Sequence, residues 1–326
     1  MASESRTAIY VGIGANVLIA ATKFAAALAT GSSAMVAEGV HSLVDSGDGL
    51  LLLLGHARGA RPADEGHPLG HGKELYFWSL IVAILFFALG GGMSFYEGIQ
   101  HILHPEPMSD PKWNYVVLAA STVFTAWSFT VAFREFHKRA GMSSYWETFK
   151  RSKDPTIFTL VLEDLADLVG LLFAFLGVYF GHRLKNPYLD GAASIGIGLV
   201  MATVAVLLAR ESKGLLIGES ANRGEREAIR AAACGDTDVA DVRRIITQYY
   251  GPETVLVLMD VVFRPGLDGA SIGAATDRME ARIREVRPQV KHIYIETESL
   301  RDISIKGSGL LKDDDARHHD STNLTP

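Results

Sequence analysis

From Thr7 to about Ala209, long apolar runs alternate with short polar loops. Each run is long enough to cross a hydrocarbon core of about 30 Å, which takes roughly 20 helical residues. The runs lie near Thr7–Thr30, Ser33–Ala57, Glu74–Leu103, Asn114–His137, Thr156–Gly181 and Tyr188–Ala209. The pattern therefore predicts an α-helical membrane domain of six transmembrane helices, over residues 1–212.

The pattern changes after Arg210, where segments typical of a small soluble domain begin. In order, they predict a helix near 223–233, strands near 242–250 and 254–263, a helix near 271–286 and a strand near 292–298. This order predicts an α+β domain over residues 213–305, with a small antiparallel sheet and helices on one face. The polar residues 306–326 predict a disordered tail.

The basic residues of the loops predict the orientation of the helices. On one side the loops contain Arg58, Arg61, Lys73, Lys138, Arg139, Lys150, Arg151 and Lys153, and on the other side they contain only Lys112, Arg183 and Lys185. Loops rich in Lys and Arg face the cytoplasm, so both termini and the α+β domain are expected there. Within the first span, Lys23 is expected to extend its ammonium group toward the membrane interface.

Composition narrows the chemistry. The formal net charge is −6, and no basic cluster is interleaved with aromatic residues, which argues against a nucleic-acid partner. Cys234 is the single cysteine, so the chain has no internal disulfide and no thiolate metal cluster. Any metal site must therefore use His, Asp and Glu. The N-terminal residues lack the features of a secretory signal, so the first apolar run is expected to remain a membrane span.

The second apolar run carries Glu38, His41, Asp45 and Asp48. At 3.6 residues per turn these positions share one face of a helix. An ionisable group that faces hydrocarbon costs roughly 2.5–3.5 kcal/mol, so this face is expected to point toward protein or water and to have a function. The alternative is a buried polar seam that only holds helices together, although such seams usually use Ser, Thr or Asn.

The fifth apolar run carries a second pair, Glu163 and Asp167, which share a face, whereas Asp164 is turned about 100° away. Together with His41 and Asp45, this pair offers one imidazole and three carboxylates, a full ligand set for a divalent cation such as Zn²⁺. Because ligands must lose protons to bind metal, protonation releases the metal, which is the physical basis of exchange. The alternative is two independent interhelical hydrogen-bonding pairs.

A third cluster lies in the loop between the second and third spans. Asp64, His67 and His71 occur there within PADEGHPLGHGKE. The glycines of this segment allow the loop to fold the three side chains toward one metal ion. The alternative is that these side chains are simply solvated.

Taken together, these motifs resemble the cation diffusion facilitator transporters over about residues 7–300. The matching positions are Asn16, Lys23, Gly31-Ser32, His41-Ser42-x-x-Asp45, Asp64-x-x-His67-x3-His71-Gly72-Lys73, Pro155, Glu163-x3-Asp167 and Asp190-Gly191. Most zinc-carrying members have histidine where Glu163 stands, and the glutamate resembles the branch that contains the mitochondrial animal zinc transporter. An oxygen-rich site accepts Mn²⁺, Fe²⁺ or Co²⁺ more readily than a two-histidine site does, so the metal stays open.

The resemblance implies a six-helix domain in a lipid bilayer, a cytoplasmic metallochaperone-like domain of the ferredoxin-like type, and a homodimer. It implies export of Zn²⁺ or a similar ion in exchange for protons, not enzymatic catalysis. The implied transport site is His41, Asp45, Glu163 and Asp167, and the implied loop site is Asp64, His67 and His71. The C-terminal domain is expected to dimerise. It is also expected to lack a strong metal site, because His292 is the one histidine between Arg223 and Arg301.

Two other functions fit some of these features. A non-transporting membrane protein could use the same sites to sense metal, and its C-terminal domain to signal or to act as a scaffold. An intramembrane metalloenzyme, with Glu38 or Asp48 as general base, is disfavoured because four protein ligands leave no open position for water. The Ala- and Gly-rich spans and the lack of a transit peptide lead us to expect a bacterial inner membrane.

Overall fold

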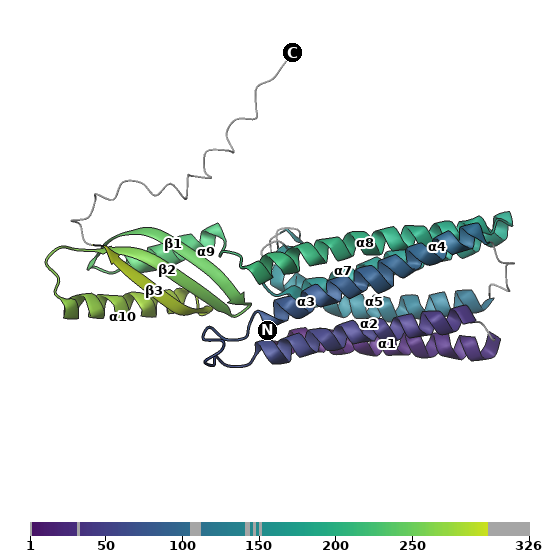
Figure 1. Ribbon diagram of the computed structural model, residues 1–326, viewed down its shortest axis with the longest axis horizontal. Helices are drawn as coiled ribbons and strands as arrows, with labels where there is room; N and C mark the ends of the chain where they lie inside the picture. The colour runs from purple at the N-terminus through teal and green to yellow at the C-terminus, as the bar shows by residue number, and fades with distance from the viewer. Residues whose placement is uncertain are drawn as a thin grey trace, which may run out of the picture.

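The computed structural model describes residues 2–30, 33–104, 112–140, 144–145, 148–149 and 152–298. Within these ranges, the side chains of residues 2–6, 30, 33–38, 40–41, 139–140 and 298 are not described. The predicted tail, residues 306–326, lies outside the described residues. A helical unit and a smaller C-terminal unit of mixed structure lie end to end along the long axis of the molecule (Figure 1).

Long helices that lie side by side form the first unit (Figure 1). They are α1 (Ala2–Thr30), α2 (Ser33–Gly59), α3 (Glu74–Leu85), η1 (Phe86–Gly92), α4 (Met93–Leu103), α5 (Lys112–Ala140), α7 (Pro155–Leu184) and α8 (Tyr188–Ile217). The segments α3, η1 and α4 follow one another without a break and form one rod whose middle is π-helical. The π-helical segment ends in three glycines, which stabilise a regular α-helix poorly.

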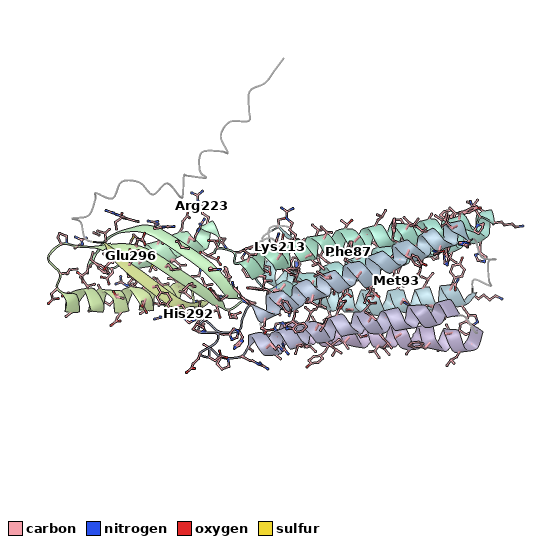
Figure 2. All side chains as sticks on the ribbon, viewed as in Figure 1. Phe87, Met93, Lys213, Arg223, His292 and Glu296 are labelled. Atoms are coloured by element: carbon pink, nitrogen blue, oxygen red, sulfur yellow. The ribbon has the colours of Figure 1, made fainter. Side chains whose placement is uncertain are left out.

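Apolar side chains cover much of the outside of the helical unit. Phe87 and Met93 project from it in Figure 2, and they are 49% and 47% exposed. Inside the unit, Leu52, Tyr76 and Leu208 are fully buried in one hydrophobic core. A surface this apolar is suited to hydrocarbon rather than to water, so the helical unit is a membrane domain.

Four helical stretches of the described chain are long and apolar enough to cross a membrane. They are Thr7–Ala29, Glu74–Leu103, Lys112–Lys138 and Tyr188–Ile217. The prediction of six spans is therefore confirmed only for these four. Helices α2 and α7 have similar lengths and carry carboxylates in their middle, and they are not among these four.

The C-terminal unit has the predicted order of helix, strand, strand, helix and strand. Its elements are α9 (Arg223–Cys234), β1 (Val239–Gly251), β2 (Thr254–Phe263), α10 (Gly269–Val286) and β3 (Val290–Glu298). Both helices share one hydrophobic core with the sheet, to which Ile229, Val257 and Met279 contribute. An Asn222 capping box begins α9, and the Asp268 carboxylate accepts a hydrogen bond from the Ser271 N–H to begin α10.

The prediction of a purely antiparallel sheet is wrong. The strand order is β1-β2-β3, with β1 antiparallel to β2 and β2 parallel to β3. The connection from β1 to β2 is a tight hairpin, which reverses the chain. The connection from β2 to β3 passes through α10, and a helical crossover returns the chain in the same direction.

The two units meet beside the loop that follows α2. The ammonium group of Lys73 lies 4.6 Å from the centroid of the Tyr250 ring, and Lys153 forms an ion pair with Glu219. The backbone of Gly72 packs so closely on the β1–β2 hairpin that a side chain there would collide with the carbonyl oxygen of Tyr250. The loop with the predicted metal ligands therefore sits at the junction of the two units.

Candidate metal-binding sites

Helices α2 and α7 carry the predicted intramembrane site and run in opposite directions (Figure 1). The Asp154 side chain caps α7 by accepting a hydrogen bond from the Thr156 N–H at 3.1 Å, and proline occupies the first turn. This start places Glu163 about two turns into the helix and Asp167 about one turn further. Both helices therefore carry their acidic residues away from their ends.

The charges that act on each buried carboxylate of α7 indicate which acidic residues of α2 lie near it. Among charged groups, Asp45 acts most strongly on Asp167, and Asp48 acts most strongly on Glu163. The antiparallel course of the helices explains this pairing, because the later residue of α2 meets the earlier residue of α7. The side chain of His41 lies outside the described residues, so its role as a ligand stays a prediction.

The Asp48–Glu163 pair is buried and incompletely hydrogen-bonded. Asp48 is 6% exposed, and its Oδ1 atom has no hydrogen-bond partner among the described residues. The Oε1 atom of Glu163 is also buried and also has no hydrogen-bond partner among the described residues. Asp164 instead accepts a hydrogen bond from the Ser128 hydroxyl at 2.8 Å. Buried polar atoms are normally paired, so the two unpaired oxygens require an explanation.

Lys23 takes part in the polar interior of the bundle. Its ammonium group donates a hydrogen bond to the Ser42 hydroxyl at 2.9 Å, and its positive charge attracts Asp167. The prediction that Lys23 only extends toward the interface is therefore wrong. The physical reason is that several carboxylates inside the bundle offer this cation a stronger partner than the headgroup region does. Its position in the middle of an apolar run was the available sequence signal.

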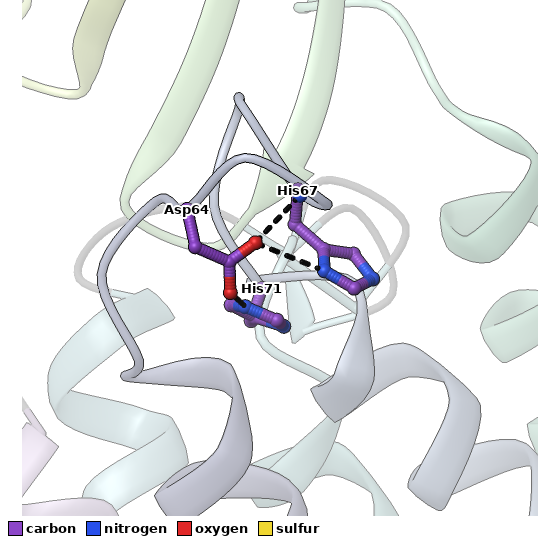
Figure 3. Close-up of side chains that lie close together, drawn as sticks. All are labelled: Asp64, His67 and His71. Atoms are coloured by element: carbon purple, nitrogen blue, oxygen red, sulfur yellow. Dashed lines mark hydrogen bonds and ion pairs between the residues drawn. The ribbon is translucent and has the colours of Figure 1, made fainter.

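The predicted loop ligands are brought together (Figure 3). The carboxylate of Asp64 lies 2.9 Å from Nε2 of His71 and 3.4 Å from Nδ1 of His67. Asp64 and His67 also exchange backbone hydrogen bonds in a tight turn, and Gly70 adopts a positive φ of 87° that favours glycine. One possible ligand atom from each residue lies within 4.8 Å of the others.

The loop cluster is charged and accessible. A hydrogen bond from His71, the backbone N–H of His67 and the His67 side chain lower the pKa of Asp64 to about 2. The side chains of Asp64 and His67 are more than half exposed, whereas His71 is 10% exposed. Ligand atoms of one Zn²⁺ ion are separated by at most about 4.2 Å, twice the usual metal–ligand distance, so a small adjustment suffices to bind it.

No second group of this kind occurs in the described part of the chain, where the loop set alone brings three His, Cys, Asp or Glu ligand atoms within 4.8 Å of one another. The intramembrane carboxylates interact at longer range and do not converge to that spacing. In the C-terminal unit, His292 lies on β3. The expectation that this unit lacks a strong metal site stays a prediction.

Comparisons with known proteins identify the family of the helical unit. Residues 9–217 match the model of the cation efflux transmembrane domain. The chain is 30% identical to the mitochondrial proton-coupled zinc antiporter SLC30A9 of Xenopus laevis, over 82% of this chain and 55% of that protein. It is 25% identical to metal tolerance protein C4 of Arabidopsis thaliana, over 90% of this chain and 73% of that protein. It is 27% identical to the cation-efflux pump FieF of Shigella flexneri, over 68% of this chain and 69% of that protein.

The chain spans little more than half the length of the SLC30A9 relatives that it matches. The family match, in contrast, covers the helical unit from Ile9, within α1, to the end of α8. This unit carries the paired carboxylates of α2 and α7 and the loop ligands between them. The chain therefore belongs to the cation efflux family, also known as the cation diffusion facilitators.

Proposed function

We propose that this protein is a secondary transporter that exports a divalent transition-metal cation from the cytoplasm in exchange for protons. The observation that carries the proposal is the set of facing carboxylates on α2 and α7, deep inside an apolar helical bundle. Zn²⁺ is the first candidate, because the SLC30A9 relatives are named as proton-coupled zinc antiporters. The three carboxylates of the proposed transport site also suit Mn²⁺, Fe²⁺ or Co²⁺.

The proposed transport site consists of His41, Asp45, Glu163 and Asp167. Without a cation, neighbouring buried carboxylates repel one another and are stabilised by taking up protons. A metal ion replaces those protons, and returning protons displace the metal, so the two cargoes compete for one set of oxygens. Exposing this set alternately to either side of the membrane then couples their opposite movements.

The proposed topology has six spans, with α2 and α7 added to the four apolar helices. Their acidic faces would be shielded by the neighbouring helices. The start of α1 lies at the end of the bundle nearest the C-terminal unit (Figure 1), which supports placing both termini on the cytoplasmic side. We also propose a division of the chain into residues 1–212, 213–305 and 306–326. The proposed location is a bacterial inner membrane, as the Shigella flexneri relative is bacterial.

The proposed assembly is a homodimer joined through the C-terminal unit. Ile246, Leu258 and Tyr294 are register partners across the sheet and are 42%, 39% and 57% exposed. An apolar row on a sheet face supports contact with a second copy, because such patches are otherwise unfavourable in water.

The second candidate function is a metal sensor or scaffold in the membrane. The observation that favours it is the loop cluster at the junction of the two units. The loop contacts the β1–β2 hairpin, so metal binding there would act directly on the position of the hairpin. This function requires metal binding but no movement of cargo.

Transport in proteoliposomes distinguishes the two functions. Wild-type protein is expected to move Zn²⁺ against protons, and Asp45→Ala or Asp167→Ala is expected to lower the rate by about tenfold or more, because each removes a ligand without creating a buried charge. Glu227→Gln, on the exposed face of α9, is the matched control and should transport at the wild-type rate. Metal binding without counterflow in the wild type would favour the sensor.

A further inference from the structure

Asp48 is an unusual residue for the middle of a packed helix. It follows Asp45 on the inner face of α2, and Leu52, one turn further along the same face, is fully buried in the hydrophobic core. Asp48 itself is 6% exposed, and its Oδ1 has no hydrogen-bond partner among the described residues. A carboxylate in such a place is costly unless a cation or donor binds it.

The side chain opposite Asp48 does not supply that partner. Glu163 lies near enough for the Asp48 charge to act on it, and its buried Oε1 atom also has no hydrogen-bond partner among the described residues. The charged groups that act most strongly on Glu163 are the carboxylates of Asp48, Asp167, Asp164 and Asp45. The cation Lys23 acts instead on Asp167, at the other end of the acidic set. The Asp48–Glu163 end therefore concentrates negative charge and free oxygen atoms.

We infer that Asp48 is a further ligand of the transported cation and binds it together with Glu163. The inference rests on the proposed transport function and adds a residue that the proposed set of four ligands does not include. With Asp48, the site offers four carboxylates besides His41. Carboxylates that now interact at long range are drawn together by a divalent ion, which supplies the missing partner for both unpaired oxygens.

The added ligand has a consequence for selectivity. Zn²⁺ is satisfied by four ligands in tetrahedral geometry, so a fifth adds little to its binding. Mn²⁺ and Co²⁺ readily accept six ligands, and Mn²⁺ in particular prefers oxygen. Asp48 thus favours the larger coordination number and narrows the preference for Zn²⁺ over Mn²⁺.

The test is Asp48→Asn in the full-length protein, because asparagine keeps the size of the side chain and removes its charge. His67→Ala and His71→Ala are introduced in all samples so that the loop does not bind metal. Titration calorimetry with Zn²⁺ or Mn²⁺ at fixed pH is expected to show a loss of Mn²⁺ affinity about tenfold larger than the loss of Zn²⁺ affinity. Asp48→Glu, which retains a carboxylate, is expected to recover most of the Mn²⁺ affinity.

Two controls separate the possible failures. Asp164→Asn changes a neighbouring buried carboxylate that Ser128 already satisfies, and it should preserve the ratio of the two affinities. Asp45→Asn should lower the affinity for both Zn²⁺ and Mn²⁺. Unchanged Zn²⁺ and Mn²⁺ affinities in Asp48→Asn, with loss in Asp45→Asn, would overturn the inference alone. Unchanged affinities in both variants would overturn the proposed transport site as well.

Discussion

Two buried aspartates in this protein have opposite surroundings. Asp236, at the start of the C-terminal sheet, is 3% exposed and accepts hydrogen bonds from the Arg278 guanidinium at 2.8 and 2.9 Å. Asp48, inside the membrane unit, has an oxygen atom, Oδ1, without a hydrogen-bond partner among the described residues. The first carboxylate ties α10 to the sheet and is permanently satisfied. The second is left available, which is the condition that reversible binding of a cation requires.

The Asp236–Arg278 contact predicts a specific loss of stability in acid. The guanidinium lowers the pKa of Asp236 from 3.8 to about 2. A lowered folded-state pKa stabilises the fold above the unfolded value, and this stability is lost as the pH falls from about 4 toward 2. The protection of the α10 amides against hydrogen exchange, measured relative to their intrinsic exchange rate at each pH, should therefore fall over this range in the full-length protein.

The variant Asp236→Asn should show the same weakening at neutral pH. Loss of the charged hydrogen bonds is expected to cost about 1–3 kcal/mol of local stability, measured by the same amide exchange. Glu227→Gln removes a solvent-exposed ion pair with Arg223 and is expected to change stability by less than about 1 kcal/mol. Equal amide exchange of α10 in Asp236→Asn and in the wild type would contradict the stabilising role assigned to the Asp236–Arg278 contact.

At the scale of elements, glycines set the contact between the rod formed by α3, η1 and α4 and helix α8. Gly91 and Gly98 lie on the rod, and Gly191 and Gly198 lie on α8. A Cβ atom at Gly98 would lie 2.7 Å from the Gly191 carbonyl oxygen, and one at Gly198 would lie 2.9 Å from that of Gly91. Lipid provides no hydrophobic force between helices, so this close backbone packing is an important source of their association.

Gly98→Ala is expected to force the two helices apart. A methyl group pressed against rigid backbone should lower stability by about 1–3 kcal/mol, seen as a reduced midpoint of thermal unfolding in detergent. The control is Gly14→Ala in α1, where nothing lies within 4 Å of the added methyl group. That change should be neutral or slightly stabilising, because alanine favours helix. Equal midpoints in the two variants would argue against the glycine contact.

At the scale of the whole molecule, the two units are joined beside the loop cluster. Lys153 pairs with Glu219, and the Tyr76 hydroxyl donates a hydrogen bond to the backbone oxygen of Lys153 at 3.1 Å. The same region holds His71, adjacent to Gly72, whose backbone packs on the β1–β2 hairpin. The loop cluster and the C-terminal unit are thus linked through direct contacts.

The proposed homodimer is tested at this scale by Leu258→Glu. A charge in the middle of the exposed apolar row should prevent a second copy from covering it, so the mass measured by light scattering in detergent should fall toward that of a monomer. Leu258→Ile keeps an apolar side chain suited to a strand and should leave the mass unchanged. A dimeric Leu258→Glu protein would place the interface elsewhere.

Much of this organisation follows from local rules that act along the chain. Apolar runs of membrane length predict the helices, and period-two segments beside Gly251 predict the β1–β2 hairpin. Helical periodicity alone places Asp45 and Asp48 on one face. The nearness of Asp64, His67 and His71 also follows from the sequence, because the three residues lie within one short loop.

Only the tertiary structure decides which acidic residues face one another. Periodicity fixes the angle of a side chain around its own helix, but not how far one helix is shifted along another. That shift brings Asp48 near Glu163 and Asp45 near Asp167, and it allows the charge of Lys23 to act on Asp167. The parallel pairing of β2 with β3 has a similar origin, since it depends on where α10 packs and not on the strand residues themselves.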